Sequence, residues 1–94
     1  MSLRFQWNAQ KAVRNERKHR VTFAEAATVF RDPLAEIFDD EEHSEEEYRE
    51  IIIGRSDRLR LIVVSFTERG DVIRIISARK ADREECEDYE NANR

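Results

Sequence analysis

The sequence is poor in the residues that build several common kinds of functional site. Its one cysteine, Cys86, cannot form a disulfide within the chain. With two histidines far apart along the chain, a structural zinc site is not expected. Two glycines, Gly54 and Gly70, are too few for a glycine-rich phosphate loop. The longest hydrophobic run, residues 61–64, is far too short for a membrane helix or a signal-peptide core. These absences predict a cytoplasmic protein without a bound metal or cofactor.

Charge is abundant instead, and its two signs are unevenly distributed along the chain. Residues 36–50 contain nine of the 21 acidic residues and one of the 17 basic residues. The remainder holds 12 acidic and 16 basic residues, a net charge of +4, although the whole chain carries −4. Local charge decides what a surface attracts, so the overall acidity does not exclude an anionic ligand.

Helix signals occur at three places in a chain whose length fits one domain, residues 1–94. Asn8 can cap a helix over residues 9–19. Thr22 and Glu25 form a capping-box pattern before a second helix, which carries an apolar stripe and ends before Pro33. Asp82 and Glu85 repeat the capping-box pattern before a third helix. That last helix has a thin apolar side, which predicts that a partner completes its burial.

Stretches rich in β-forming residues separate these helices. The predicted strands cover residues 5–7, 34–38, 48–55, 59–68 and 72–79. The strand over 59–68 has apolar residues on both faces, which is typical of a central strand. The acidic run 39–47 is expected to be a solvated loop.

The predicted hairpin around Gly70 brings basic side chains together. A two-residue loop at Gly70 and Asp71 pairs Arg69 with Val72, Thr67 with Arg74 and Ser65 with Ile76. Opposite residues share a face, so Arg69 and Arg74 would form a positive patch with no acid between them. A phosphodiester would match their guanidinium groups. The alternative is that each arginine is a surface residue paired with a nearby carboxylate.

The first helix carries further candidates. His19 can exchange protons near neutral pH, although the helix dipole alone also favours histidine at a helix C-terminus. Lys11, Arg14 and Lys18 share one face of this helix. Trp7 could stack on a base, although a core position is the more common role of a tryptophan.

Several motifs occur together in a specific order and spacing. They are Phe5-x-Trp7, Lys18-His19, Asp32-Pro33 and the run GRSDRLRLIVVSFTERGDVIRIISARKA over residues 54–81. Together they resemble the BrnT family, RelE-like ribonuclease toxins of type II toxin–antitoxin systems. Arg20 and Leu59 depart from this pattern, because glycine is usual in the family at both positions.

The resemblance implies a fold, an activity and partners. The fold would be α+β and RelE-like, with N-terminal helices packed on an antiparallel sheet and a C-terminal helix. The activity would be metal-independent endonucleolytic cleavage of RNA, which inhibits translation. The partner would be a BrnA-like ribbon-helix-helix antitoxin, through which the complex binds operator DNA.

Cleavage of this kind needs groups that stabilise charge on a phosphate and groups that move protons. For stabilising the phosphate we assign Arg69, Arg74 and Arg79, and for proton transfer His19. For binding RNA we assign Lys11, Lys18 and Trp7. Strict strand alternation places Arg79 on the opposite face from Arg74, so Arg79 joins the site only through a bulge or at the strand end.

Two other classes of function stay open at this point. One is a non-catalytic module whose positive face docks an acidic antitoxin segment; it would bind the partner and never cleave RNA. The other is a DNA-binding regulator, which is weaker because no helix offers a convincing recognition surface.

Overall fold

The computed structural model describes residues 3–43 and 47–94. Residues 44–46, part of the acidic run expected to form a loop, lie outside this description. The elements in chain order are β1 (Arg4–Gln6), α1 (Ala9–His19), α2 (Phe23–Thr28), the 3-10 helix η1 (Val29–Arg31), β2 (Glu36–Asp39), the 3-10 helix η2 (Glu41–His43), β3 (Glu50–Arg55), β4 (Leu61–Arg69), β5 (Val72–Lys80) and α3 (Arg83–Ala92).

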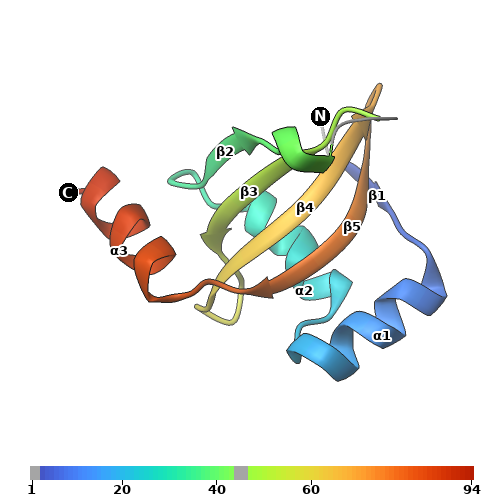
Figure 1. The fold of residues 1–94 in the computed structure, drawn as a ribbon, viewed down its shortest axis with the longest axis horizontal. Helices are drawn as coiled ribbons and strands as arrows, with labels where there is room; N and C mark the ends of the chain where they lie inside the picture. The colour runs from blue at the N-terminus through green and yellow to red at the C-terminus, as the bar shows by residue number, and fades with distance from the viewer. Residues whose placement is uncertain (1–2, 44–46) are drawn as a thin grey trace.

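The five strands form one sheet in the order β1-β5-β4-β3-β2, with β4 in the centre as predicted (Figure 1). The pairs β2–β3, β3–β4 and β4–β5 are antiparallel. Strand β1 pairs in parallel with β5, so the sheet is mixed rather than purely antiparallel. The predicted α+β class is confirmed, and the parallel pair arises because the N-terminal strand lies at the far edge beside the last strand.

The core lies between one face of the sheet and the helices α1 and α2 with η1 (Figure 1). Phe66 of the central strand is fully buried and meets Phe30 edge-on at 4.9 Å between ring centroids. Phe30 in turn contacts Phe5 of β1 at 5.2 Å. This chain of aromatic contacts ties the edge strand to the centre of the sheet, because each ring buries a large apolar surface.

Helix α1 has the predicted bounds and the predicted cap. The Asn8 side chain accepts a hydrogen bond from the Lys11 N–H at 3.0 Å. The helix ends at His19, and its C-cap Arg20 is left-handed with φ 60°, a conformation that glycine adopts more easily.

Buried Asn15 fastens α1 to the edge of β5. Its amide nitrogen donates to the carbonyl oxygens of Val21 at 3.0 Å and Ala78 at 2.8 Å. Its amide oxygen accepts from the Ala78 N–H at 3.1 Å. Strand β1 covers only the first part of β5, so the Asn15 amide replaces a missing strand at Ala78.

Helix α2 is shorter than its apolar stripe predicted, because the last turn is the 3-10 helix η1. Thr22 caps it by accepting from the Glu25 N–H at 3.0 Å. The predicted return bond from the Glu25 side chain to the Thr22 backbone is wrong. The Glu25 carboxylate instead accepts from Ser56 Oγ at 2.7 Å and from Arg60 Nε at 2.9 Å. A buried carboxylate is stabilised better by a guanidinium than by one backbone N–H.

Helix α3 has the complete capping box predicted for Asp82 and Glu85. Its one buried residue, Tyr89, donates a hydrogen bond to Asp32 Oδ2 at 2.7 Å and lies 5.6 Å beneath the guanidinium of Arg55. The helix stands at one end of the sheet and extends away from the body (Figure 1).

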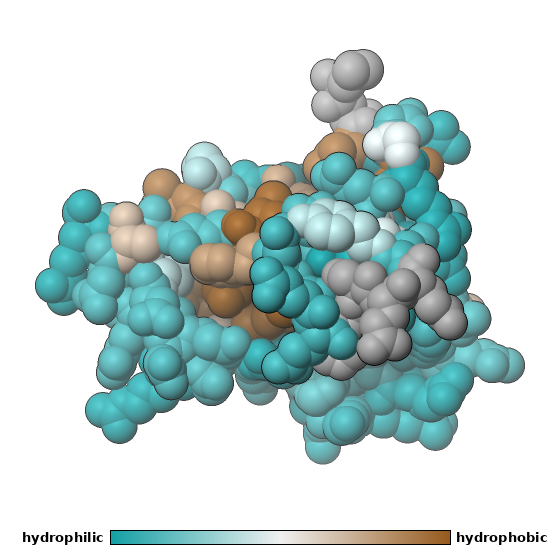
Figure 2. Space-filling view, turned by 45° about the horizontal axis from the view of Figure 1, so that its top comes forward, coloured by the Kyte–Doolittle hydropathy of each residue, from teal (hydrophilic) through white to brown (hydrophobic). Residues whose placement is uncertain are grey.

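Apolar side chains gather on the surface beside α3, over the edge strand β2 (Figure 2). Phe38 of β2 is 47% exposed and lies next to Tyr89 of α3. Leu34 and Tyr48 near β2 are 50% and 56% exposed, and Ile37, at 53%, points to the opposite face of β2. Exposed apolar surface of this kind is typical of a contact site for another protein.

Gly54 of β3 lies where the sheet meets η1, and no side chain fits there. A Cβ atom at this position would lie 2.8 Å from the Ala35 Cβ and 3.0 Å from the Val29 Cγ1. We expect Gly54→Ala to lower the free energy of unfolding by about 1–3 kcal/mol through overpacking. Urea unfolding of the wild-type and Gly54→Ala proteins measures this change in the free energy of unfolding. Gly70→Ala, which meets no atom within 4 Å, would be destabilised through its φ of 63° instead.

Candidate functional site

The three predicted arginines lie on the sheet face that points away from α2; we call Arg69, Arg74 and Arg79 the arginine face. The register pairs Arg69 with Val72, Thr67 with Arg74 and Val63 with Arg79. The first two pairings are the predicted ones.

A β-bulge brings Arg79 to this face. Ser65 pairs with Ser77 and Phe66 with Ile75, so Ile76 is an extra residue on β5. The predicted pairing of Ser65 with Ile76 is therefore wrong. One extra residue reverses the alternation of side chains beyond it, and Arg79 then shares the face of Arg74.

Two of the three arginines hold carboxylates, which corrects the expectation of a patch without acids. Arg69 Nε donates to Glu47 Oε1 at 2.6 Å. Arg79 donates through both terminal nitrogens to the two oxygens of Glu85, at 2.7 and 2.9 Å. Hydrogen bonds from Arg79 are the main reason that the pKa of Glu85 lies below its ordinary value. Glu47 reaches Arg69 from the segment before β3, and Glu85 reaches Arg79 from α3.

Arg74 differs from its two neighbours on the face. It is half-buried, and its side chain makes no hydrogen bond or ion pair within the part of the chain that the structure describes. The Thr67 hydroxyl opposite it is committed elsewhere, because it donates to the Tyr48 carbonyl at 2.8 Å. Arg74 is thus the guanidinium of the arginine face whose charge is available to an external anion.

The candidates from α1 lie along the edge of β5, apart from the arginine face. His19, the last residue of the helix, is half-buried. It follows Asn15 by four residues and so shares the helix side that faces β5. Lys11 and Lys18 are exposed. No described contact joins His19 to an arginine of the face.

Trp7 follows β1 and packs on the core, meeting Phe23 edge-on at 6.0 Å between ring centroids. It remains 38% exposed, so one side of its ring faces solvent. Its main role in the fold is packing.

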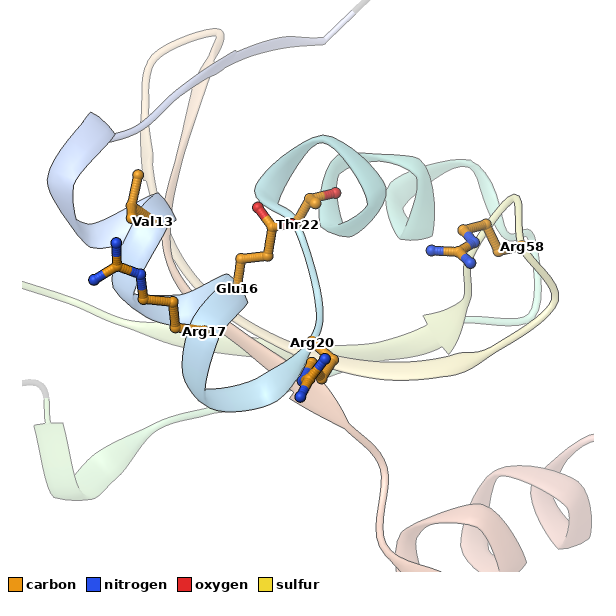
Figure 3. Close-up of a pocket in the computed structure, with 6 residues that line it drawn as sticks. All are labelled: Val13, Glu16, Arg17, Arg20, Thr22 and Arg58. Atoms are coloured by element: carbon orange, nitrogen blue, oxygen red, sulfur yellow. The ribbon is translucent and has the colours of Figure 1, made fainter.

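A second group of arginines was missed by sequence reasoning. A groove of about 560 Å³ lies between α1, the start of α2 and the β3–β4 turn (Figure 3). Its lining residues are Val13, Glu16, Arg17, Arg20, Thr22 and Arg58; we call it the basic groove. The sequence signal that could have found it is Arg20, an arginine at a position where glycine would be easier.

Two separate carboxylates are held by hydrogen bonds: buried Glu25 beside the basic groove, and partly buried Asp32 near α3. Hydrogen bonds from Arg60 are the main reason that the pKa of Glu25 is lowered, against the opposing effect of burial. For Asp32, burial is the largest influence and raises the pKa, but hydrogen bonds from the Arg55 N–H and the Tyr89 hydroxyl outweigh it. Both carboxyls are therefore held ionised by the fold and stabilise it as anions.

The described residues give no group of three or more histidine, cysteine, aspartate or glutamate side chains that could hold a metal ion. Within residues 3–43 and 47–94, no helix combines the length and apolar character needed to cross a membrane.

Comparison with known proteins places this geometry in a family. A comparison with curated proteins finds no match. The crystal structure of the Brucella abortus ribonuclease toxin BrnT superposes with a TM-score of 0.66 and 25% sequence identity. That match covers 87% of this chain and 100% of the Brucella chain. The family model described as "Ribonuclease toxin, BrnT, of type II toxin-antitoxin system" matches residues 7–85. The chain therefore belongs to the BrnT family of ribonuclease toxins.

Proposed function

We propose that this protein is a single-domain cytoplasmic endoribonuclease that cleaves RNA without a metal ion and thereby inhibits translation. The observation that carries the proposal is the β-bulge, which gathers Arg69, Arg74 and Arg79 on one sheet face. Fixed guanidinium groups stabilise the extra negative charge that a phosphate acquires during cleavage.

The proposed reaction uses the RNA itself as nucleophile. The ribose 2′-oxygen forms a bond to the adjacent phosphorus, and the bond from phosphorus to the 5′-oxygen breaks. One proton leaves the 2′-hydroxyl and one joins the departing 5′-oxygen, so the products end in a 2′,3′-cyclic phosphate and a 5′-hydroxyl. His19 is our candidate for one of these proton transfers.

The remaining assigned residues would hold the substrate. Lys11 and Lys18 are exposed on α1 and suit contacts with the RNA backbone. The exposed side of Trp7 could stack on a base. In this proposal these residues position RNA, while the arginine face acts on the phosphate.

An antitoxin is the expected partner of a type II toxin. We propose a BrnA-like ribbon-helix-helix antitoxin that binds operator DNA for the complex. Its docking on the arginine face and α3 is supported by the carboxylates of Glu47 and Glu85, which show that acidic groups fit there. The exposed apolar surface over β2, next to α3, would add the buried area that a stable interface needs.

The same surface supports the second candidate, a module that binds the antitoxin without cleaving RNA. The two candidates differ in one measurement. The purified protein is incubated with a 5′-labelled RNA in the presence of a chelator, and the products are separated by size.

We expect cleavage to continue in the chelator and to yield 2′,3′-cyclic phosphate ends, because arginines replace the metal. Arg74→Ala protein, purified in the same way, controls for contaminating ribonucleases. Activity that vanishes with chelator and returns with magnesium contradicts the metal-independent mechanism. Absence of cleavage under every condition, together with tight antitoxin binding, selects the binding module.

A further inference from the structure

The basic groove carries a positive charge that the fold itself does not use. Within the described residues, the side chains of Arg17 and Arg20 make no hydrogen bond or ion pair. Arg58 lies 3.8 Å from Glu25, but that carboxylate is already bound by Arg60. Against these three arginines the groove lining has one exposed acid, Glu16.

Arg20 is held in this groove at a conformational cost. Its φ of 60° and ψ of 32° are left-handed, where a side chain is strained and glycine is not. The backbone of Arg20 ends the helix by donating to the Glu16 carbonyl at 2.9 Å and by accepting from Arg60 at 3.2 Å. Both bonds are made by the backbone of Arg20, so its guanidinium group does not stabilise the fold. A strained backbone conformation at a residue whose side chain does not stabilise the fold is typical of a binding position.

The groove also lies close to one end of the arginine face. Arg60, which binds the Arg20 carbonyl, directly precedes β4. Arg79 pairs with Val63, near the start of the same strand. The groove is on the helical side of this sheet end and Arg79 on the other side, so one extended strand could contact both.

We propose that the basic groove binds the phosphodiester backbone of single-stranded RNA whose scissile phosphate lies on the arginine face. The inference rests on the proposed function. Guanidinium groups match phosphate oxygens in geometry and keep their charge at any physiological pH. An acidic peptide fits less well, because it needs apolar anchors. The groove offers one, Val13, whereas the larger exposed apolar surface lies over β2.

The test relies on two opposite effects expected of Arg20: it strains the backbone, and its guanidinium group binds RNA. Arg20→Gly removes the guanidinium and the strain together, so we expect a melting temperature a few degrees higher and RNA binding about fivefold weaker. Leu59→Gly is the matched control. Leu59 has the same left-handed backbone, with φ 62°, but does not line the groove. It should raise the melting temperature and leave RNA binding unchanged.

Binding is measured by fluorescence anisotropy with a 2′-O-methyl RNA 12-mer, which lacks the nucleophile and cannot be cleaved. The double variant Arg17→Gln/Arg58→Gln should weaken binding about 25-fold if the two contacts add. The slope of log affinity against log salt should fall by about 0.7 for each lost contact. Arg31→Gln, an exposed arginine of η1 outside the groove, should change neither.

Unchanged RNA affinity in the double variant would overturn the assignment. It would also be overturned if the double variant lost affinity for a polyglutamate peptide but kept its affinity for RNA. The inference and the proposed function fail separately. If the wild-type protein never cleaves RNA but binds it through the groove, only the proposed endoribonuclease activity is contradicted. If the protein cleaves RNA but its RNA affinity does not depend on the groove arginines, only the RNA-binding role of the basic groove is contradicted.

Discussion

Replacing Arg74 by alanine is expected to lower the rate of RNA cleavage by two to three orders of magnitude. Loss of one preorganised donor to the reacting phosphate costs about 3–4 kcal/mol of transition-state stabilisation. Arg74 should show the full effect, because its guanidinium has no competing partner among the described residues, whereas Arg69 and Arg79 hold Glu47 and Glu85. Cleavage of a labelled RNA under single-turnover conditions measures the loss.

The fold of the Arg74→Ala protein should be intact, because the side chain makes no hydrogen bond or ion pair within the described part of the chain. Circular dichroism and thermal unfolding check this. Arg31→Ala is the matched control, an exposed arginine on the opposite side of the sheet, and should cleave at the wild-type rate. Full activity of a folded Arg74→Ala protein would contradict the placement of the phosphate.

Replacing Asn15 by alanine is expected to cost about 3–5 kcal/mol of unfolding free energy. The change leaves the carbonyls of Val21 and Ala78 and the N–H of Ala78 without their partner in a buried place. Each unpaired buried group costs about 1–3 kcal/mol. Since a domain of this size is stable by about 5–15 kcal/mol, the variant should lose a large share of its stability.

Urea unfolding followed by circular dichroism measures the cost. Asn8→Ala is the matched control, because its side chain makes one exposed capping bond and its loss should cost about 1 kcal/mol. Equal costs for the two variants would show that Asn15 does not fasten α1 to β5. The position of His19, one turn beyond Asn15, would then lose its support.

Short-range interactions explain which predictions succeeded. The caps of Asn8, Thr22 and Asp82 act within four residues, and all three are formed. The run of apolar residues over 61–64 indicated a central strand, and β4 is central. The spacing of motifs along the whole chain carried the family resemblance, which does not depend on knowing any contact.

The role of the buried Glu25 carboxylate could not be predicted in the same way. Its spacing from Thr22 is that of a capping box, but its carboxylate binds Arg60, which is 35 residues away. A local pattern and a distant cation compete for the same side chain, and the fold decides which one lies within reach.

The sequence by itself determined the order of the elements, the helix caps and the family to which the chain belongs. The tertiary structure alone decided that Arg79 lies on the same face as Arg69 and Arg74, and that the basic groove exists. One extra residue, Ile76, turns Arg79 to the side of Arg74. The strained backbone of Arg20 and the β3–β4 turn bring Arg58 near α1. The physical reason is that side-chain alternation is local, whereas a bulge, a salt bridge or a groove depends on segments that meet only when the chain folds.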